Sequence, residues 1–375
     1  MADFLSRADR SILGKWWWTI DKPLLFSFIT LLITGVFLSF AASPVVADRI
    51  NLDSYFFVKR HALMAAVAFM IMIVFSILKT KNIRFLSWGI FVFCFISLIL
   101  TPIVGMEIKG ARRWINLLGF SLQSSELIKP TFVVITSWIL SQSKEVTRIN
   151  QIVLSGILWL SVIALILLQP DFGMTFIISA AWFIQIFLAG LPLLWVWIMS
   201  FIGVFGGVSA YYLLPHVASR INRFLDPTSG DQYQITQSLE AIRSGGFLGQ
   251  GPGEGMVKRY LPDAHSDFVF SVAAEEFGFI VCFIIVSVYA FICIRGTILA
   301  RKEHIKFLML CVLGLTYQFS LQALVNIGSS IKLIPTKGMT LPFLSYGGSS
   351  LIGIGICTGI ILNMTRKRVD DRGVL

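Results

Sequence analysis

The chain has 375 residues, of which 56% are hydrophobic and 14% are charged. A soluble fold cannot bury this much apolar surface, so the composition excludes an ordinary soluble enzyme or binding module. With 31 Lys and Arg against 20 Asp and Glu, the formal net charge is +11 at pH 7. The five cysteines stand in apolar segments without CxxC or Cys/His spacing, which indicates small core residues and neither a disulfide framework nor a metal site.

Apolar runs long enough to cross about 30 Å of hydrocarbon recur along the chain. They lie at 23–42, 62–78, 85–103, 127–140, 152–168, 173–191, 193–214, 268–294, 305–325 and 344–362. The sequence therefore predicts an all-α integral membrane protein of about ten transmembrane helices. The one long loop, at about 215–267 between helices 7 and 8, is too short for a core of its own, so we expect residues 1–375 to form a single membrane domain. Residues 1–21 contain no cleavable signal pattern.

Basic residues orient this bundle. They fill the short loops at 79–84 and 295–306, and both terminal segments are also basic. The positive-inside rule places these segments in the cytoplasm, so we expect a multi-pass protein of the cytoplasmic (inner) membrane with both termini inside. The loop 215–267 is then periplasmic. Lys and Arg residues also remain on the outer face, where an anionic ligand such as a lipid diphosphate would account for them. Hydration or contact with headgroups is the alternative.

The first polar cluster on the outer side holds Arg112 and Arg113, followed by Glu126 and Lys129. Glu126 and Lys129 are three residues apart, so on a helix they share a face and can pair. Within a membrane span such a pair normally points into a cavity and away from lipid. A structural ion pair that fixes the short fourth helix is the alternative interpretation.

Two further clusters follow. Asp171 stands between Pro170 and Gly173, where it can either serve a site or simply cap the next helix. The glycine-rich stretch 245–255 is neither a Walker A loop nor a Rossmann turn, so nucleotide binding is disfavoured and no nucleic-acid partner is expected. Lys258 comes next and suits a phosphate or sugar contact, although a plain flexible turn is the alternative.

The most informative cluster is Tyr260 to Ser271, because it joins the polar loop directly to an apolar helix. Asp263, His265 and Asp267 are therefore placed at a membrane surface, where partial shielding from water can turn a carboxylate into a useful base. The entry to the last span, 335–350, is rich in proline and glycine. Its serines have no nearby partner base, which argues against a serine nucleophile. Glu275 and Glu276 lie in the apolar helix that follows Asp267, where a charged side chain is costly in contact with lipid. We therefore expect one of them to face a cavity or a basic partner.

Together these motifs resemble the SEDS family (shape, elongation, division and sporulation) of bacterial membrane glycosyltransferases. The matching segments are Gly110-Ala-Arg-Arg-Trp-Ile115, Ser125-Glu-Leu-Ile-Lys129, Gln169-Pro-Asp171, the loop from Tyr233 to Lys258, Leu261-Pro-Asp-Ala-His-Ser-Asp-Phe-Val-Phe270 and Leu341-Pro-Phe-Leu-Ser-Tyr-Gly-Gly-Ser-Ser350. Residues 251–259 and 16–21 look most like the division branch in alphaproteobacteria, and the elongation branch is the alternative. One departure is Ser124, where the family usually has proline.

The resemblance implies polymerisation of lipid II, the undecaprenyl-diphosphate-linked disaccharide pentapeptide, on the outer face of the membrane. It carries the catalytic aspartate onto Asp267, which would act as general base in an inverting transfer. Arg112, Arg113 and Lys258 would neutralise the departing diphosphate. The other residues expected to bind substrate are Glu126, Lys129 and Asp171.

The resemblance also implies partners and a place in the cell. The partners would be a class B penicillin-binding protein transpeptidase and other division-complex proteins, at the division septum. No cofactor motif is evident, and a divalent cation is left open. Two other functions compete with polymerisation. A lipid-precursor flippase or transporter would also have intramembrane charges and broken helices, but its polar groups should not gather on one face. A non-catalytic division scaffold is compatible with the enzyme.

Overall fold

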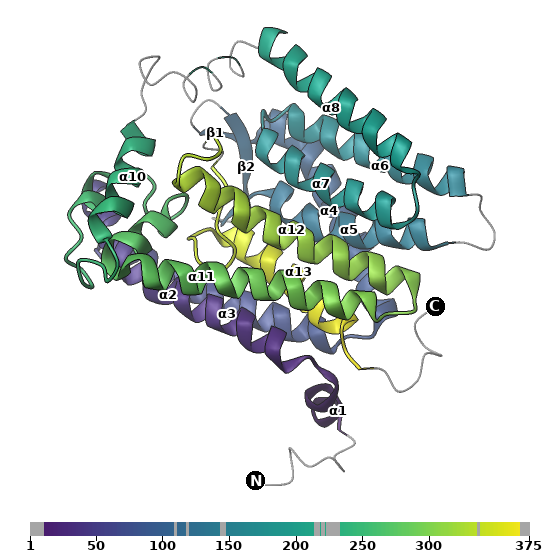
Figure 1. Ribbon diagram of the computed structural model, residues 1–375, viewed down its shortest axis with the longest axis horizontal. Helices are drawn as coiled ribbons and strands as arrows, with labels where there is room; N and C mark the ends of the chain where they lie inside the picture. The colour runs from purple at the N-terminus through teal and green to yellow at the C-terminus, as the bar shows by residue number, and fades with distance from the viewer. Residues whose placement is uncertain are drawn as a thin grey trace.

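The computed structural model describes residues 11–108, 111–117, 120–142, 148–213, 218, 222, 233–335 and 338–367. Over these ranges the chain consists mainly of long helices packed into one bundle (Figure 1). The helices are α1 (Ile12–Thr19), α2 (Lys22–Arg49), α3 (Phe56–Ile77), α4 (Thr80–Val104), α5 (Ser124–Ser141), α6 (Arg148–Leu167), α7 (Phe172–Leu188), α8 (Leu193–Leu213), α10 (Tyr233–Gly245), the short 3₁₀ helix η2 (Val257–Tyr260), α11 (Val269–Arg301), α12 (Lys306–Ser330) and α13 (Gly348–Met364).

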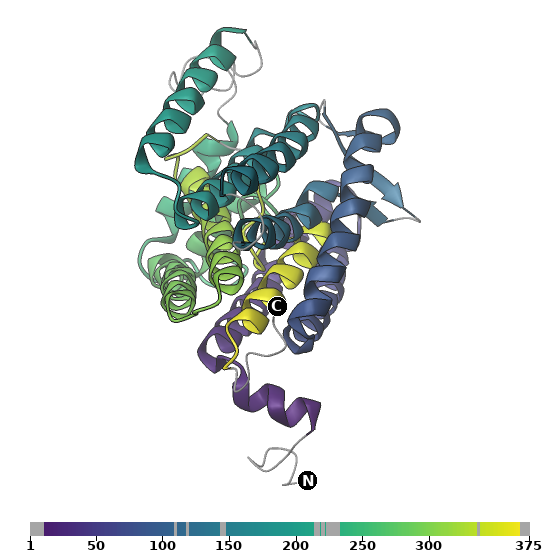
Figure 2. The same cartoon turned by 90° about the vertical axis from the view of Figure 1, so that its right-hand side faces the viewer.

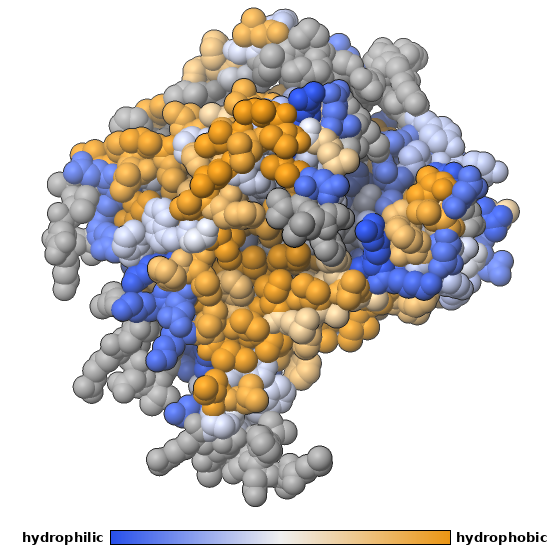
Figure 3. All heavy atoms as spheres, turned by 180° about the vertical axis from the view of Figure 1, so that it is seen from behind, coloured by the Kyte–Doolittle hydropathy of each residue, from blue (hydrophilic) through white to orange (hydrophobic). Residues whose placement is uncertain are grey.

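Every predicted span falls on one of these helices, which confirms the multi-pass membrane architecture. In the described part of the chain, 6 helices are long and apolar enough to cross a membrane by themselves, namely α2, α3, α4, α6, α11 and α12. The figure of ten crossings stays a prediction. Much of the outward surface is hydrophobic, as lipid contact requires, and hydrophilic residues gather toward the two sides of the face in Figure 3.

The centre of the bundle is formed by α5, α12 and α13, whose side chains are largely buried. Glycines bring α13 unusually close to α3. A Cβ on Gly355 would lie 2.7 Å from the carbonyl oxygen of Ala68, and one on Gly359 would lie 2.7 Å from that of Met72. This four-residue spacing of small residues is a common device for close packing of helices in membranes. By contrast α8 lies at the outside of the bundle, as Figure 2 shows.

The two described chain ends meet at one end of the bundle. The amide of Lys367 donates to Thr19 O at 2.9 Å, and Arg366 Nε donates to Thr19 Oγ1 at 2.9 Å. Asn363 Nδ2 donates to Leu78 O at 2.5 Å, so the α3–α4 connection lies there as well. This arrangement supports the expectation that both termini lie on one side of the membrane.

A small antiparallel sheet interrupts the helices between α4 and α5, and the all-α prediction is wrong for this segment. It has the order β1 (Met106–Ile108), β2 (Ala111–Leu117) and β3 (Phe120–Leu122). Strands β1 and β3 have three residues each, and β2 contains two adjacent arginines and two adjacent apolar residues, so none of these strands shows the strict alternation by which a strand is recognised in sequence. Gly110, the first residue of the quoted arginine motif, lies outside the described residues.

The loop predicted at 215–267 is more structured than a glycine-rich turn. Residues 214–232, apart from 218 and 222, lie outside the described ranges, but the remainder contains α10 and η2 and packs on α11. The contact depends on Gly278, which interrupts α11 with φ 73°. Beyond this break the amides of Phe279 and Ile280 donate to the carbonyls of Gly246 and Phe247, at 2.9 and 3.3 Å.

The carbonyls released on the other side of the break are used in the same way. Glu275 O accepts from the amide of Gln250 at 2.9 Å, and Glu276 O accepts from that of Gly251 at 3.0 Å. The loop therefore replaces the helical hydrogen bonds that α11 gives up. Because unpaired backbone groups are costly inside a membrane protein, this exchange fixes the loop to the helix.

We expect Gly278→Ala to destabilise the protein. A side chain there would be held at a positive φ, and its Cβ would come within 2.4 Å of Gly249 N. Such strained backbone costs about 1–3 kcal/mol before the steric overlap is added. Thermal unfolding of the purified protein in detergent measures the effect. Gly207→Ala in α8, where a Cβ meets nothing within 4 Å, is the matched control and should leave the midpoint unchanged or slightly higher. Equal midpoints for the two variants would contradict the role of the break.

Candidate functional site

Asp267 stands just before α11, at the end of a tight turn. The carbonyl of Asp263 accepts the amides of Ser266 and Asp267, at 3.0 and 3.1 Å. Asp263 itself has φ 53°, a left-handed conformation that aspartate tolerates better than most residues. Asp267 is half-buried, so its carboxylate is partly shielded by the protein. The turn thus presents a carboxylate at the boundary that the sequence predicted.

A second segment passes close to this carboxylate. An added Cβ on Gly338 would lie 3.6 Å from Asp267 Oδ2, and Gly338 has φ 62°. Asn326 of α12 joins the two segments, because its Nδ2 donates to Asp267 O at 2.9 Å and to Met339 O at 2.5 Å. The position of Asp267 is therefore set by α12 as well as by its own turn.

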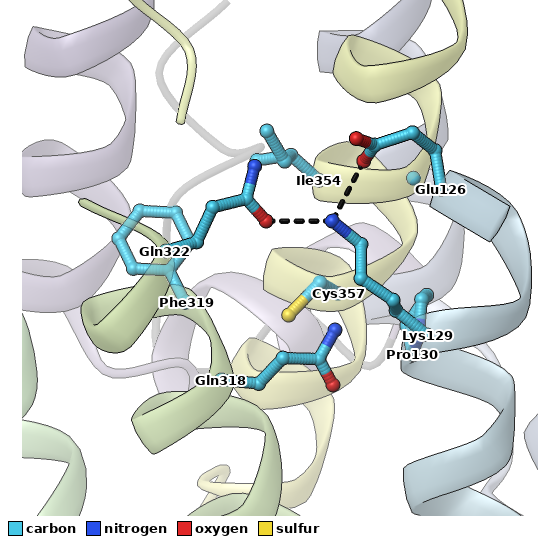
Figure 4. Close-up of a pocket in the computed structure, with 9 residues that line it drawn as sticks. Glu126, Lys129, Pro130, Gln318, Phe319, Gln322, Ile354 and Cys357 are labelled. Carbon is cyan, nitrogen blue, oxygen red and sulfur yellow. Dashed lines mark hydrogen bonds and ion pairs between the residues drawn. The ribbon is translucent and has the colours of Figure 1, made fainter. Parts of the chain in front are cut away.

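One helical turn earlier on α12, Gln322 continues this network. Its Nε2 donates to Thr340 O at 3.0 Å, and its Oε1 accepts from Lys129 Nζ at 2.7 Å. Lys129 in turn pairs with Glu126 at 2.8 Å, and both side chains are 3% exposed. Figure 4 shows the ammonium of Lys129 lying between Glu126 and Gln322. The predicted pairing of Glu126 with Lys129 is confirmed, and the pair faces the protein interior.

A small cavity borders this charged pair. It encloses about 10 Å³ and is lined by Glu126, Lys129, Gln322, Gln318 and Cys357 among others (Figure 4). That volume is about what a single water molecule needs. Polar side chains on one face of α12 connect the buried pair of Glu126 and Lys129, through Gln322 and Asn326, to the backbone of Asp267.

Gln322 and Asn326 were not among the site residues predicted from the sequence. Their signal was available in the pattern of α12, where Gln318, Gln322 and Asn326 recur every four residues in an otherwise apolar span. Side chains at this spacing share one face of a helix. A polar stripe within a membrane span normally faces the interior of the bundle or a cavity, as it does here.

Arg113 and Asp171 meet, but their contacts are structural. Arg113 donates to the carbonyls of Gln169 and Pro170, at 3.1 and 2.7 Å, and its guanidinium lies 3.9 Å from Asp171. Asp171 Oδ1 accepts the amide of Met174 at 3.1 Å and caps α7. The capping interpretation of Asp171 is thus confirmed. Together the two residues clamp strand β2 to the turn between α6 and α7.

Arg112 faces the other way, because successive residues of a strand point to opposite faces. Its side chain is 49% exposed, against 16% for Arg113. Its guanidinium lies 3.5 Å from Glu107 and donates to Pro102 O at 3.3 Å. Of the two predicted cations on this strand, Arg112 is therefore the one that a ligand outside the bundle can reach.

Lys258 does not have the surface position expected of a phosphate contact. Its side chain is 5% exposed, it forms an ion pair with Glu276, and it donates to Ala41 O at 3.2 Å. The neighbouring Glu275 accepts the amides of Val257 and Lys258, at 2.7 and 2.8 Å. These contacts confirm that Glu276 has a basic partner. The charge of Lys258 is thus paired inside the protein, where it holds η2 against α11, and its predicted contact with a phosphate or sugar stays a prediction.

The remaining sequence predictions concern metal and nucleophile chemistry. Within the described ranges, no group of three or more His, Cys, Asp or Glu side chains is arranged to hold a metal ion. Ser345 donates to Ser266 O and accepts the amide of Leu341 at 2.8 Å, and Ser349 donates to Ser121 O at 3.1 Å. Ser345 thus joins the segment before α13 to the Asp267 turn, and Ser349 joins α13 to β3.

The sequence and the fold both have known relatives. A family model described as cell cycle protein, covering FtsW, RodA and SpoVE, matches residues 22–370. The probable peptidoglycan glycosyltransferase FtsW of Caulobacter vibrioides is 40% identical over 369 residues, which is 98% of this chain and 95% of the relative. The stage V sporulation protein E of Bacillus subtilis is 34% identical, with 92% and 97% of the two chains covered.

Two solved structures share the fold. One comes from a peptidoglycan synthase complex described as coordinating polymerization and crosslinking, with a TM-score of 0.77 at 26% identity and coverage of 92% of this chain and 97% of that one. The other is the rod shape determining protein RodA of Thermus thermophilus, with a TM-score of 0.71 at 26% identity and coverage of 95% and 99%. The chain therefore belongs to the FtsW/RodA/SpoVE family of cell cycle proteins, the SEDS family that its motifs resemble.

Proposed function

We propose that this protein is a peptidoglycan glycosyltransferase that polymerises lipid II into glycan strands on the outer face of the cytoplasmic membrane during cell division. The relatives named FtsW, including the Caulobacter protein, support this activity and the division role. The observation that carries the proposal is the half-buried Asp267, held at a helix start by Asn326 and connected through α12 to a buried charged pair.

In this reaction Asp267 acts as general base. Its carboxylate removes the proton from the attacking hydroxyl of the acceptor sugar, and that oxygen displaces the lipid diphosphate from the anomeric carbon of the donor. The diphosphate departs as a stable anion, so one carboxylate is enough and no general acid is required. A single displacement inverts the α-linked donor to a β-linked glycan. Arg112, with half of its side chain exposed, offers a positive charge for the departing diphosphate.

The buried pair of Glu126 and Lys129 supports the site from within. Removing either charge would lower the stability of the protein, because an unpaired charge in a low-dielectric interior is strongly destabilising. Through Gln322 the pair also fixes the segment at Thr340, which lies next to the residues that adjoin Asp267. Arg113 and Asp171 serve the site indirectly, by anchoring the strand that carries Arg112.

The protein works as one membrane domain with partners. A class B penicillin-binding protein would crosslink the strands that this chain makes, in keeping with the synthase complex that shares the fold. Other division-complex proteins would recruit both to the septum. In this topology both termini lie in the cytoplasm, and the loop that ends at Asp267 lies in the periplasm.

The role of Asp267 as general base can be tested by substitution. Asp267→Asn keeps the size of the side chain but cannot accept a proton, so polymerisation of lipid II should fall by about 10²- to 10⁴-fold. The purified protein with its partner is assayed for glycan chains, and co-purification of the partner reports folding. Asp263→Asn, four residues earlier in the same turn, is the control and should retain far more activity. Normal polymerisation by Asp267→Asn would remove the assignment.

The second prediction concerns the buried pair. Lys129→Ala should lower both expression and activity, because it leaves Glu126 unpaired in the interior. The double variant Glu126→Gln, Lys129→Met removes both charges at similar volume, so expression should recover while activity stays low. Membrane yield and lipid II polymerisation are measured for both. A fully active double variant would show that the pair serves only folding.

The third prediction tests topology with cysteines placed at exposed positions. A membrane-impermeant thiol reagent, added to cells with a permeabilised outer membrane, should label Glu254→Cys and leave Lys81→Cys unlabelled. The unaltered chain, with its five native cysteines, gives the background. The opposite labelling pattern would reverse the proposed orientation.

A further inference from the structure

Three aromatic rings from separate parts of the chain meet beside the Asp267 turn. Phe57 comes from the first turn of α3, His265 from the turn itself, and Tyr346 from the segment before α13. The ring centroids are 4.6 Å apart for Phe57 and His265, 5.3 Å for Phe57 and Tyr346, and 5.3 Å for His265 and Tyr346. These three residues, the aromatic cluster, are each partly exposed.

The cluster is fastened to the backbone that carries the proposed base. The amide of Tyr346 donates to His265 O at 2.9 Å, and the hydroxyl of Ser345 donates to Ser266 O. Asp267 follows directly. The segment that carries Tyr346 is therefore held to the backbone of the turn that carries Asp267.

The composition of the cluster is unusual for a packing contact. Aliphatic side chains fill a membrane-protein interior at no polar cost, whereas here an imidazole and a phenol stand together at the surface. Behind them His61 is fully buried, with its ring centroid 6.3 Å from that of Tyr346. Within the described residues neither ring nitrogen of His61 has a hydrogen-bond partner. A buried polar group left in this state is expensive, which is typical of a site that awaits a ligand or its water.

We infer that the aromatic cluster is a binding subsite on which a pyranose ring of the substrate stacks. One face of a pyranose presents C–H groups, which pack on the negatively polarised face of an aromatic ring. Its hydroxyl and N-acetyl groups lie around the edge, where the imidazole of His265 and the phenol of Tyr346 can hydrogen-bond to them. A ring held there lies beside Asp267, where the acceptor hydroxyl is required. This inference rests on the proposed function, since it identifies how that site holds its sugar.

The main competing explanation is an interfacial anchor, because aromatic residues are also enriched where a membrane meets water. The two explanations differ in what they predict. An anchor contributes to insertion and stability whatever the ligand, and a neighbouring aromatic residue at the same boundary should matter equally. A sugar subsite affects only ligands that carry the sugar.

The test measures binding without turnover. In the Asp267→Asn protein we add Tyr346→Leu or Phe57→Leu, and titrate lipid II with a shortened prenyl chain. One lost aromatic contact is worth about 0.5–1.5 kcal/mol, so the dissociation constant should rise by roughly 2- to 13-fold. Tyr346→Phe keeps the ring, so its dissociation constant for lipid II should stay closer to that of the Asp267→Asn parent. The same prenyl diphosphate without sugars should bind equally to all variants.

Tyr55→Leu is the matched control, since Tyr55 is an exposed aromatic residue just before α3 and contacts Phe40 outside the cluster. Its affinity for lipid II should not change. Equal weakening by Tyr55→Leu, or weakening toward the sugar-free diphosphate, would favour the anchor and overturn the subsite. Unchanged lipid II affinity in both cluster variants would overturn it too. Because binding is read in the Asp267→Asn background, a failure of the proposed catalysis would appear separately, as retained polymerisation in that parent.

Discussion

The interruption of α11 at Gly278 is the constraint on which the outer half of this protein depends. A helix in a membrane must pair its own backbone N–H and C=O groups, and α11 does not do so at the break. The loop that follows α10 supplies both the missing donors and the missing acceptors, through Gln250, Gly251 and the carbonyls of Gly246 and Phe247. The first turns of α11, which begin just after Asp267, are therefore hydrogen-bonded to the loop through the carbonyls of Glu275 and Glu276.

Buried charges reinforce this arrangement at two places. Lys258 and Glu276 join η2 to α11, while Glu126 and Lys129 lie deeper, between α5 and α12. Removing two charges from water is costly, and a buried pair is weak evidence of net stability. Its value lies in geometry: Lys258 and Glu276 join two elements directly, and Lys129 joins α5 to α12 through its hydrogen bond to Gln322. The polar side chains of α12 connect the inner pair to the turn that holds Asp267.

Much of this could be read from the sequence because it is encoded locally. The spacing of Glu126 and Lys129 predicts their contact, and the position of Asp171 before Gly173 predicts a helix cap. What could not be read depends on residues far apart in the chain. The direction of Lys258 is decided by Glu276 on another element, and the acceptors of Asn326 lie in segments without periodicity. The small sheet was missed because β1 and β3 are too short to alternate visibly and β2, with adjacent arginines and adjacent apolar residues, does not alternate. Gly278 looked like an ordinary glycine within a helix, since a glycine in an apolar run is tolerated.

The glycine contacts between α13 and α3 bear on how this protein can change over time. Gly355 and Gly359 meet α3 mainly through its backbone, at Ala68 and Met72, so few side-chain atoms stand between the two helices to shrink or adopt another rotamer. An interface made of side chains tolerates substitutions that change side-chain size slightly, because a neighbouring side chain can change to compensate. An interface built on backbone contact offers no such compensation, because the smallest addition already forces a helix to move. Change at these two positions is therefore abrupt, and α13, which is buried along most of its length, offers few other positions where change would be tolerated.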